Sequence, residues 1–171
     1  MYIDAVRKVA LAFLLLVAAC GSAAAAPVVG VLETVCVDAF CVDVPQGWTV
    51  SDQGASFLVL VNPADQDAVI TIAPMNMEGV ATAGGRVWPI SKSEFVAVMW
   101  AVVDDGRAEV RSVEPQLDGS IDSYVVLPNG YAWHRLVTVD SPRAFSIELR
   151  APDRSWQEHA DAVRQSFRTN G

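Results

Sequence analysis

The chain has 171 residues, of which 20 are acidic and 12 are basic, and 52% of its residues are hydrophobic. A formal net charge of −8 disfavours binding to nucleic-acid phosphates, so we expect no nucleic-acid partner. The charged fraction of 19%, together with this apolar content, excludes a disordered tail. Much of the apolar content lies in the first 29 residues, and the remainder has the composition of an ordinary globular domain.

Residues 1–19 have the pattern of a secretory signal peptide. Arg7 and Lys8 precede an unbroken apolar run from Val9 to Ala19. This run is too short to cross a bilayer, which needs roughly 20 apolar residues. We therefore expect residues 1–19 to be removed on export.

Residues 16–20 (LVAAC) resemble the lipobox of bacterial lipoproteins, whose cysteine is acylated and becomes the first mature residue. The resemblance implies that Cys20 carries the lipid, a palmitate-containing membrane anchor. Residues 20–30 are small and uncharged, so they predict a flexible tether to a single globular domain over residues 31–171. Two alternatives remain, namely cleavage by an ordinary signal peptidase within residues 23–26 and a lone buried cysteine.

The other two cysteines predict a disulfide. Residues 31–44 pair as a β-hairpin about residues 38–39, which sets Cys36 opposite Cys41 and gathers the valines and Phe40 on the other face. At such a non-hydrogen-bonded pair the Cα atoms approach to about 4.5 Å, and a disulfide can form. A redox or metal-binding pair would need closer spacing or further ligands, so we expect a structural disulfide that fixes the register.

Strands dominate the next stretch. Pro45 and Gly47 predict a turn, after which Trp48 begins a short strand. Residues 56–61 and 68–73 are β-rich runs joined by residues 62–67. Residues 75–90 are expected to be the longest irregular segment.

Two helices are predicted, with four strands between them. Residues 91–94 (SKSE) have the form of a capping box, which predicts a helix through about residue 104 that is covered on more than one face. Residues 108–113, 121–127, 131–139 and 144–149 have the alternation of strands. Asp153 or Ser155 can cap a last helix through Arg168. Its apolar stripe (Trp156, Ala160, Val163 and Phe167) should lie on the sheet. We therefore predict an α+β fold, an antiparallel β-sheet with helices packed on its faces.

Two segments resemble known domains. Residues 42–50 (VDVPQGWTV) resemble the opening hairpin of PsbP-like and Mog1-like domains, and residues 156–168 (WQEHADAVRQSFR) are similar to their closing helix. The resemblance implies an α/β/α sandwich over residues 32–168 and an accessory or binding role, as in small bacterial envelope lipoproteins that share this domain. It supplies no catalytic residues to transfer onto this chain.

The two histidines carry the enzyme alternative. His134 shares a strand face with Ala132 and Leu136, so we expect a partly buried structural histidine, while the alternative is a secreted hydrolase that uses His134 beside an acid. His159 is expected on a solvated flank of the last helix. The sequence contains no G-x-S-x-G, H-E-x-x-H or phosphate-loop motif.

Two acidic groups could offer oxygens to calcium. They are Asn62 with Asp65 and Asp67, and Asp104 with Asp105. Neither has the spacing of an EF-hand loop, and ordinary turns explain both. We expect no metal and no cofactor.

Trp88 and Trp100 are the candidate binding residues. Trp88 lies in the irregular segment, and Trp100 points from the following helix on a different side from Phe95 and Met99. An exposed tryptophan could anchor a ligand, whereas core packing is the alternative for both. The leading hypothesis is a non-enzymatic envelope lipoprotein that binds another protein or an apolar small molecule through residues 75–90 and the nearby helix. A purely structural lipoprotein is the third possibility.

Overall fold

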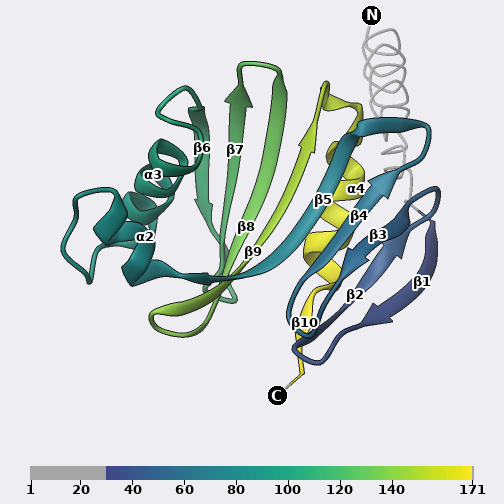
Figure 1. Ribbon diagram of the computed structural model, residues 1–171, viewed down its shortest axis with the longest axis horizontal. Coiled ribbons are helices and arrows are strands. Elements are labelled where there is room, and N and C mark those ends of the chain that lie inside the picture. Colours follow the sequence, from purple (N-terminus) through teal and green to yellow (C-terminus); the bar gives the residue numbers. More distant parts are fainter. Residues whose placement is uncertain (1–29, 171) are drawn as a thin grey trace, which may run out of the picture.

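A seven-stranded antiparallel sheet is the central feature of the computed structural model, which describes residues 30–170 (Figure 1). Its strand order is β3-β4-β5-β9-β8-β7-β6. Two antiparallel meanders meet where β5 pairs with β9, so segments about 75 residues apart in sequence lie side by side. The strands are β3 (Thr49–Gln53), β4 (Leu58–Asn62), β5 (Asp65–Asn76), β6 (Glu109–Pro115), β7 (Ile121–Leu127), β8 (Gly130–Asp140) and β9 (Arg143–Ala151).

A smaller sheet contains the predicted hairpin. It has the order β1-β2-β10, formed by β1 (Val31–Cys36), β2 (Phe40–Pro45) and β10 (Arg168–Thr169). The predicted register is confirmed, because Cys36 pairs with Cys41 across the hairpin and the two form a disulfide with a Cα–Cα distance of 4.1 Å. Disulfides persist in oxidising compartments, which agrees with an exported domain.

One core lies between the large sheet, the small sheet and α4 (Gln157–Ser166). Alternate β2 residues are fully buried against it, whereas Cys41 and Asp43 between them are only partly covered. The predicted apolar stripe of the last helix also faces this core. Its members are Trp156, Ala160, Val163 and Phe167.

A second core lies on the opposite face of the large sheet, under α2 (Met77–Ala83) and α3 (Lys92–Val103), which cover its β6-β7-β8 end (Figure 1). Ser91 caps α3 as predicted, since its hydroxyl accepts a hydrogen bond from the Glu94 backbone N–H at 3.1 Å. Helices therefore lie on both faces of an antiparallel sheet, and the predicted α+β class and α/β/α layering are confirmed.

The expectation of an irregular segment over residues 75–90 is wrong for its first half. Residues 75–76 complete β5, and α2 follows directly. The Asn76 side chain caps this helix by accepting a hydrogen bond from the Gly79 backbone N–H at 3.1 Å. Met77 and Ala81 lie one helical turn apart and are both buried, so tertiary packing stabilises a helix that Gly79 would otherwise weaken.

Three further boundaries differ from the predictions. The first strand after the turn begins at Thr49, because Trp48 closes the turn and is fully buried. Strand β5 begins at Asp65 and leaves only a two-residue connection from β4. The last helix ends at Ser166 rather than Arg168, because Arg168 and Thr169 turn into a strand that pairs with β2.

The predicted signal peptide (residues 1–19), Cys20 and the tether up to residue 29 lie outside the described residues. Within residues 30–170, no helix combines the length and apolar character that membrane crossing requires.

Candidate functional site

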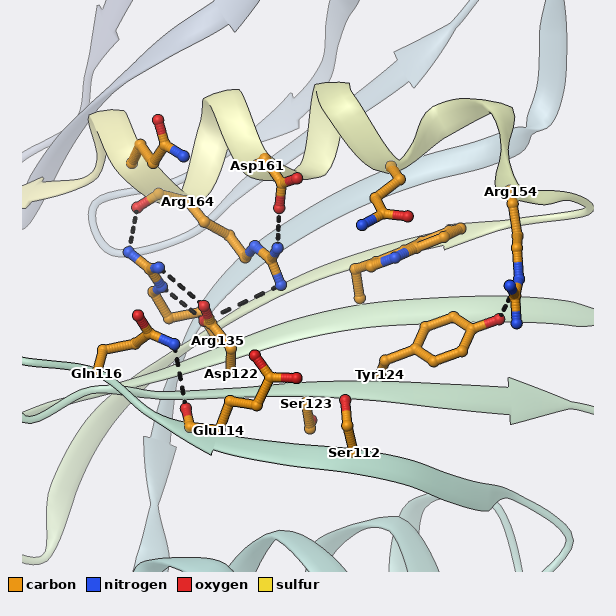
Figure 2. Close-up of a pocket in the computed structure, with 13 residues that line it drawn as sticks. Ser112, Glu114, Gln116, Asp122, Ser123, Tyr124, Arg135, Arg154, Asp161 and Arg164 are labelled. Carbon is orange, nitrogen blue, oxygen red and sulfur yellow. Dashed lines mark hydrogen bonds and ion pairs between the residues drawn. The ribbon is translucent and has the colours of Figure 1, made fainter. Parts of the chain in front are cut away.

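A polar cleft of about 510 Å³ lies between α4 and the β6-β7-β8 part of the large sheet (Figure 2). The strands supply one wall, and α4 with the short 3-10 helix η1 (Arg154–Trp156) supplies the other. In Figure 2, Glu114 and Tyr124 project from the strands toward the helix, whose Asp161 and Arg164 point back toward them. The lining residues are Ser112, Glu114, Gln116, Asp122, Ser123, Tyr124, Trp133, Arg135, Arg154, Gln157, Asp161, Arg164 and Gln165.

Strand alternation and register place the strand side chains. Successive residues of a strand face opposite sides of the sheet, and directly paired residues of neighbouring strands face the same side. Two rows of side chains therefore cross β6, β7 and β8 on the face toward α4. One row is charged (Glu114, Asp122 and Arg135), and the other is largely aromatic (Ser112, Tyr124 and Trp133).

A network of ion pairs joins the two walls. The Arg135 guanidinium donates two hydrogen bonds to the Asp122 carboxylate, at 2.7 and 2.9 Å, and a third to the backbone carbonyl of Arg164 at 3.0 Å. Arg164 pairs with Asp161 on its own helix and lies 3.9 Å from Asp122. Hydrogen bonding to Asp122 raises the pKa of Arg135 above its usual value. The network fixes α4 against β7 and β8, so the cleft is preformed.

The other end of the cleft is aromatic. The Tyr124 and Trp133 ring centroids are 5.5 Å apart, and Tyr124 stacks on Tyr131 with an interplanar angle of 11°. Arg154 donates a hydrogen bond from Nε to the Tyr124 hydroxyl at 2.7 Å, and its guanidinium lies 5.0 Å from the Tyr124 ring centroid. This cation–π contact holds Arg154 at the rim.

Glu114 and Arg154 are the two charged residues of the cleft that take no part in the ion-pair network of Asp122, Arg135, Asp161 and Arg164. Among residues 30–170, neither forms an ion pair, whereas the other arginines and aspartates of the cleft do. Three arginines and three carboxylates line the cleft, so their formal charges cancel. The cleft is therefore strongly polar but neutral.

His134 lies on the opposite face of the sheet. It is fully buried, and its ring nitrogens contact the hydroxyls of Ser123 at 3.4 Å and Ser146 at 3.0 Å. Burial lowers its pKa to about 3, with a smaller contribution from Arg164, so the ring is neutral at ordinary pH. His134 is therefore fully buried, rather than partly buried as predicted, and it contacts hydroxyls instead of the acid that the hydrolase alternative requires.

The expectation that His159 lies on a solvated flank is wrong. Its ring centroid is 5.2 Å from that of Trp156 and 6.0 Å from that of Trp48, so it packs against the first core. Burial lowers the pKa of His159 below its usual value. The contacts of the His159 ring with Trp48 and Trp156 therefore indicate a packing role.

The two candidate binding tryptophans, Trp88 and Trp100, differ in exposure. Trp100 is only 1% exposed and lies in the second core, so it offers no surface to a ligand. Trp88 is half-buried, with its ring 6.3 Å from Phe95, and the adjacent Val87 is 88% exposed.

An apolar hollow of about 580 Å³ lies near the start of residues 75–90. It is lined by Pro74, Met75, Asn76, Val139, Arg143, Ala144 and Phe145.

The residues considered as calcium ligands form turns and packing contacts instead. The Asn62 side chain accepts a hydrogen bond from the Ala64 backbone N–H at 2.9 Å, and Asp65 accepts one from the Trp156 indole at 3.1 Å. Asp104 ends α3 and is 9% exposed. Within residues 30–170, no group of three or more histidines, cysteines or carboxylates is placed to hold a metal ion.

The cleft was not among the sequence-based predictions, although the sequence contains one signal for it. Asp122 and Arg135 each lie within strands that pack against a helix, where a strand normally presents apolar residues. Arg164 directly follows Val163 of the buried stripe of α4. Charged residues at positions that face a covering helix indicate a paired network, but the pairing depends on the register between β7 and β8.

Comparison with known proteins identifies the fold. The solution structure of cyanobacterial PsbP (CyanoP) from Synechocystis sp. PCC 6803 superposes with a TM-score of 0.54 at 14% sequence identity, covering 90% of this chain and 98% of that one. A crystal structure from Bacteroides thetaiotaomicron VPI-5482 gives a TM-score of 0.40 at 16% identity, covering 77% of this chain and 45% of that one. No protein-family profile and no curated protein matches the chain. The domain therefore has a PsbP-like fold, as the resemblance implied, and this likeness defines its architecture.

Proposed function

We propose that the chain is an exported accessory protein of the bacterial envelope that binds a polar ligand, without catalysis, in the cleft between α4 and β6-β7-β8. One observation carries the proposal: the cleft walls are tied together by the Asp122–Arg135 network, while Glu114 and Arg154 face the cleft without ion-pair partners among the described residues. A preformed concave site with a few open polar groups is typical of ligand binding. The cleft replaces residues 75–90 as the preferred binding surface.

The proposal includes lipid anchoring at Cys20. The lipobox resemblance supports it, and the Cys36–Cys41 disulfide agrees with export. Replacing Cys20 with Ser should abolish palmitate labelling and release the protein from membranes. Unchanged labelling would refute the anchor and leave cleavage by an ordinary signal peptidase.

Binding is favoured over catalysis by the state of the ionisable side chains around the cleft. Asp122 and Asp161 are engaged by arginines, and His134 lies across the sheet with a lowered pKa and no exposure. General acid–base catalysis needs a group that reaches the substrate and exchanges a proton near the working pH. His134 meets neither condition.

Photo-crosslinking in intact cells tests the cleft. A photoreactive phenylalanine derivative replaces Gln157, which lines the cleft and is exposed, or the control Gln53, which is exposed on β3. The full-length protein is illuminated in cells, purified and weighed by mass spectrometry. We expect a discrete added mass from position 157 and none from position 53. The absence of an adduct at position 157, or equal adducts at both, would overturn the proposal.

The apolar hollow near Met75 is the second candidate site, for an apolar small molecule or a protein partner. It is favoured by Val139, a large apolar side chain that is 52% exposed in its lining. Photoreactive substitution of Val139 in the same experiment separates the two sites. An adduct at position 139 with none at position 157 would move the binding function to the hollow.

A further inference from the structure

We propose that the ligand of the cleft between α4 and β6-β7-β8 is a neutral saccharide. The inference rests on the proposed function, since it names the chemical class that this cleft would bind. The cleft volume of about 510 Å³ lies within the range of about 300–1,000 Å³ found for small-molecule sites.

Charge excludes the simplest alternative, an anion. Arginine side chains attract phosphates and carboxylates, but Arg135 is already bound to Asp122 and Arg164 to Asp161. An anion placed between the walls would also meet the open carboxylate of Glu114, which has no ion-pair partner within residues 30–170. A neutral ligand meets no such repulsion, and it leaves the network intact.

The open polar groups match adjacent hydroxyls. Gln157 and Gln165 are exposed along the α4 wall, and each amide carries both donors and an acceptor. Glu114 offers only acceptors and Arg154 only donors. A sugar hydroxyl donates and accepts at once, so a row of hydroxyls can satisfy all four side chains. A ligand with only acceptors would leave Glu114 unpaired at a cost in binding.

The aromatic end supplies the complementary apolar surface. Tyr124 is partly exposed in the cleft and is held by Arg154 and by stacking on Tyr131, so its ring is fixed before a ligand arrives. The C–H groups of a sugar ring carry partial positive charge and pack against the negative face of such a ring. An aromatic surface beside planar amide and carboxylate groups therefore fits a saccharide better than a purely polar ligand.

The test uses the full-length protein in a detergent without a sugar headgroup. It is applied to an array of neutral oligosaccharides that includes maltotetraose, cellotetraose and chitotetraose. Inorganic phosphate and a zwitterionic tetra-alanine peptide form two further arms, measured by calorimetry. Glu114→Gln and Gln157→Ala remove cleft groups, and Gln53→Ala is a matched exposed control outside the cleft. Thermal unfolding of each variant checks that it is folded.

We expect binding to a neutral glycan that Glu114→Gln and Gln157→Ala each weaken roughly five- to tenfold, while Gln53→Ala stays within about twofold. The absence of binding to every neutral oligosaccharide would overturn the saccharide inference. Binding of phosphate or peptide alone, with the same dependence on Gln157, would also overturn it, but this outcome would leave the proposed function standing. Glycan binding that neither cleft variant changes would overturn both, because the site would lie elsewhere.

Discussion

Arg135 on β8 and Asp122 on β7 are directly paired across the strands and joined by two parallel hydrogen bonds of 2.7 and 2.9 Å. Their side chains are 14% and 17% exposed, so the pair is largely removed from water. Arg135 also donates to the Arg164 backbone carbonyl, which ties the pair to α4. This one residue therefore sets the position of the helix that forms a wall of the cleft.

Arg135→Lys should lower the free energy of unfolding by about 1–2 kcal/mol, because lysine cannot make the two-pronged contact and also reach the helix. Arg143→Lys is the matched control, since Arg143 pairs with Asp140 through side chains that are mostly exposed. The control should change stability by less than about 0.5 kcal/mol. Urea denaturation of both variants measures the difference, and equal effects would contradict a structural role for the network.

His134 should make the domain less stable in mild acid. Its pKa is about 3 when folded and about 6.5 when unfolded, so between these values only the unfolded state binds the proton. Stability contributed by His134 is therefore complete above pH 6.5 and is lost as pH falls toward 3, at up to about 1.4 kcal/mol per pH unit.

The control for this pH dependence is His134→Asn. The lowered pKa of His159 adds a slope of the same sign in both proteins, and it cancels in the difference. Urea denaturation of the wild type and the variant between pH 4 and 7 should therefore show a shallower dependence for His134→Asn. Identical slopes would mean that His134 is not buried in the neutral form.

Removing the disulfide by replacing both Cys36 and Cys41 with Ser should cost about 2 kcal/mol, the chain-entropy value for so short a loop. Val42 and Val44 remain buried and hold the hairpin register, so the fold should persist. Chemical denaturation of the double variant, compared with the oxidised wild type, measures the loss. An unfolded double variant would show that the covalent link, rather than packing, maintains the small sheet.

Trp88→Ala should destabilise the domain by about 1–2 kcal/mol, since it removes a half-buried ring that packs on Phe95. The neighbouring Val87→Ala should change stability little, because that side chain is 88% exposed. Thermal unfolding compares the two. If Trp88→Ala left stability unchanged but reduced crosslinking of a partner in cells, the result would indicate that residues 75–90 form a binding surface.

Local signals in the sequence were enough for much of the fold. The disulfide register followed from two-residue alternation around Cys36 and Cys41, and α3 followed from the Ser91 cap. Helix α2 was missed because Gly79 lowers its intrinsic propensity, and only the burial of Met77 and Ala81 stabilises it. Strand β10 was missed because two residues that pair with β2 across more than 120 positions carry no local pattern.

The cleft could not be predicted for the same reason. Asp122 and Arg135 lie 13 residues apart on different strands, and their pairing appears only once the β7–β8 register is known. Arg154 and Tyr124 are 30 residues apart and meet because η1 precedes α4 at the end of the sheet. Trp100, a candidate binding residue, and His134, the residue of the hydrolase alternative, are both buried in the domain.

The most direct test of the cleft is its occupancy in the cell. Gln157→Cys places a thiol in the cleft, and Gln53→Cys places one on exposed β3, while Cys36 and Cys41 are blocked by their disulfide. Maleimide labelling rates are compared between intact cells and the purified full-length protein. A bound ligand predicts that position 157 reacts several-fold more slowly in cells while position 53 reacts equally in both. Equal rates at position 157 in cells and in the purified protein would contradict a ligand-binding cleft.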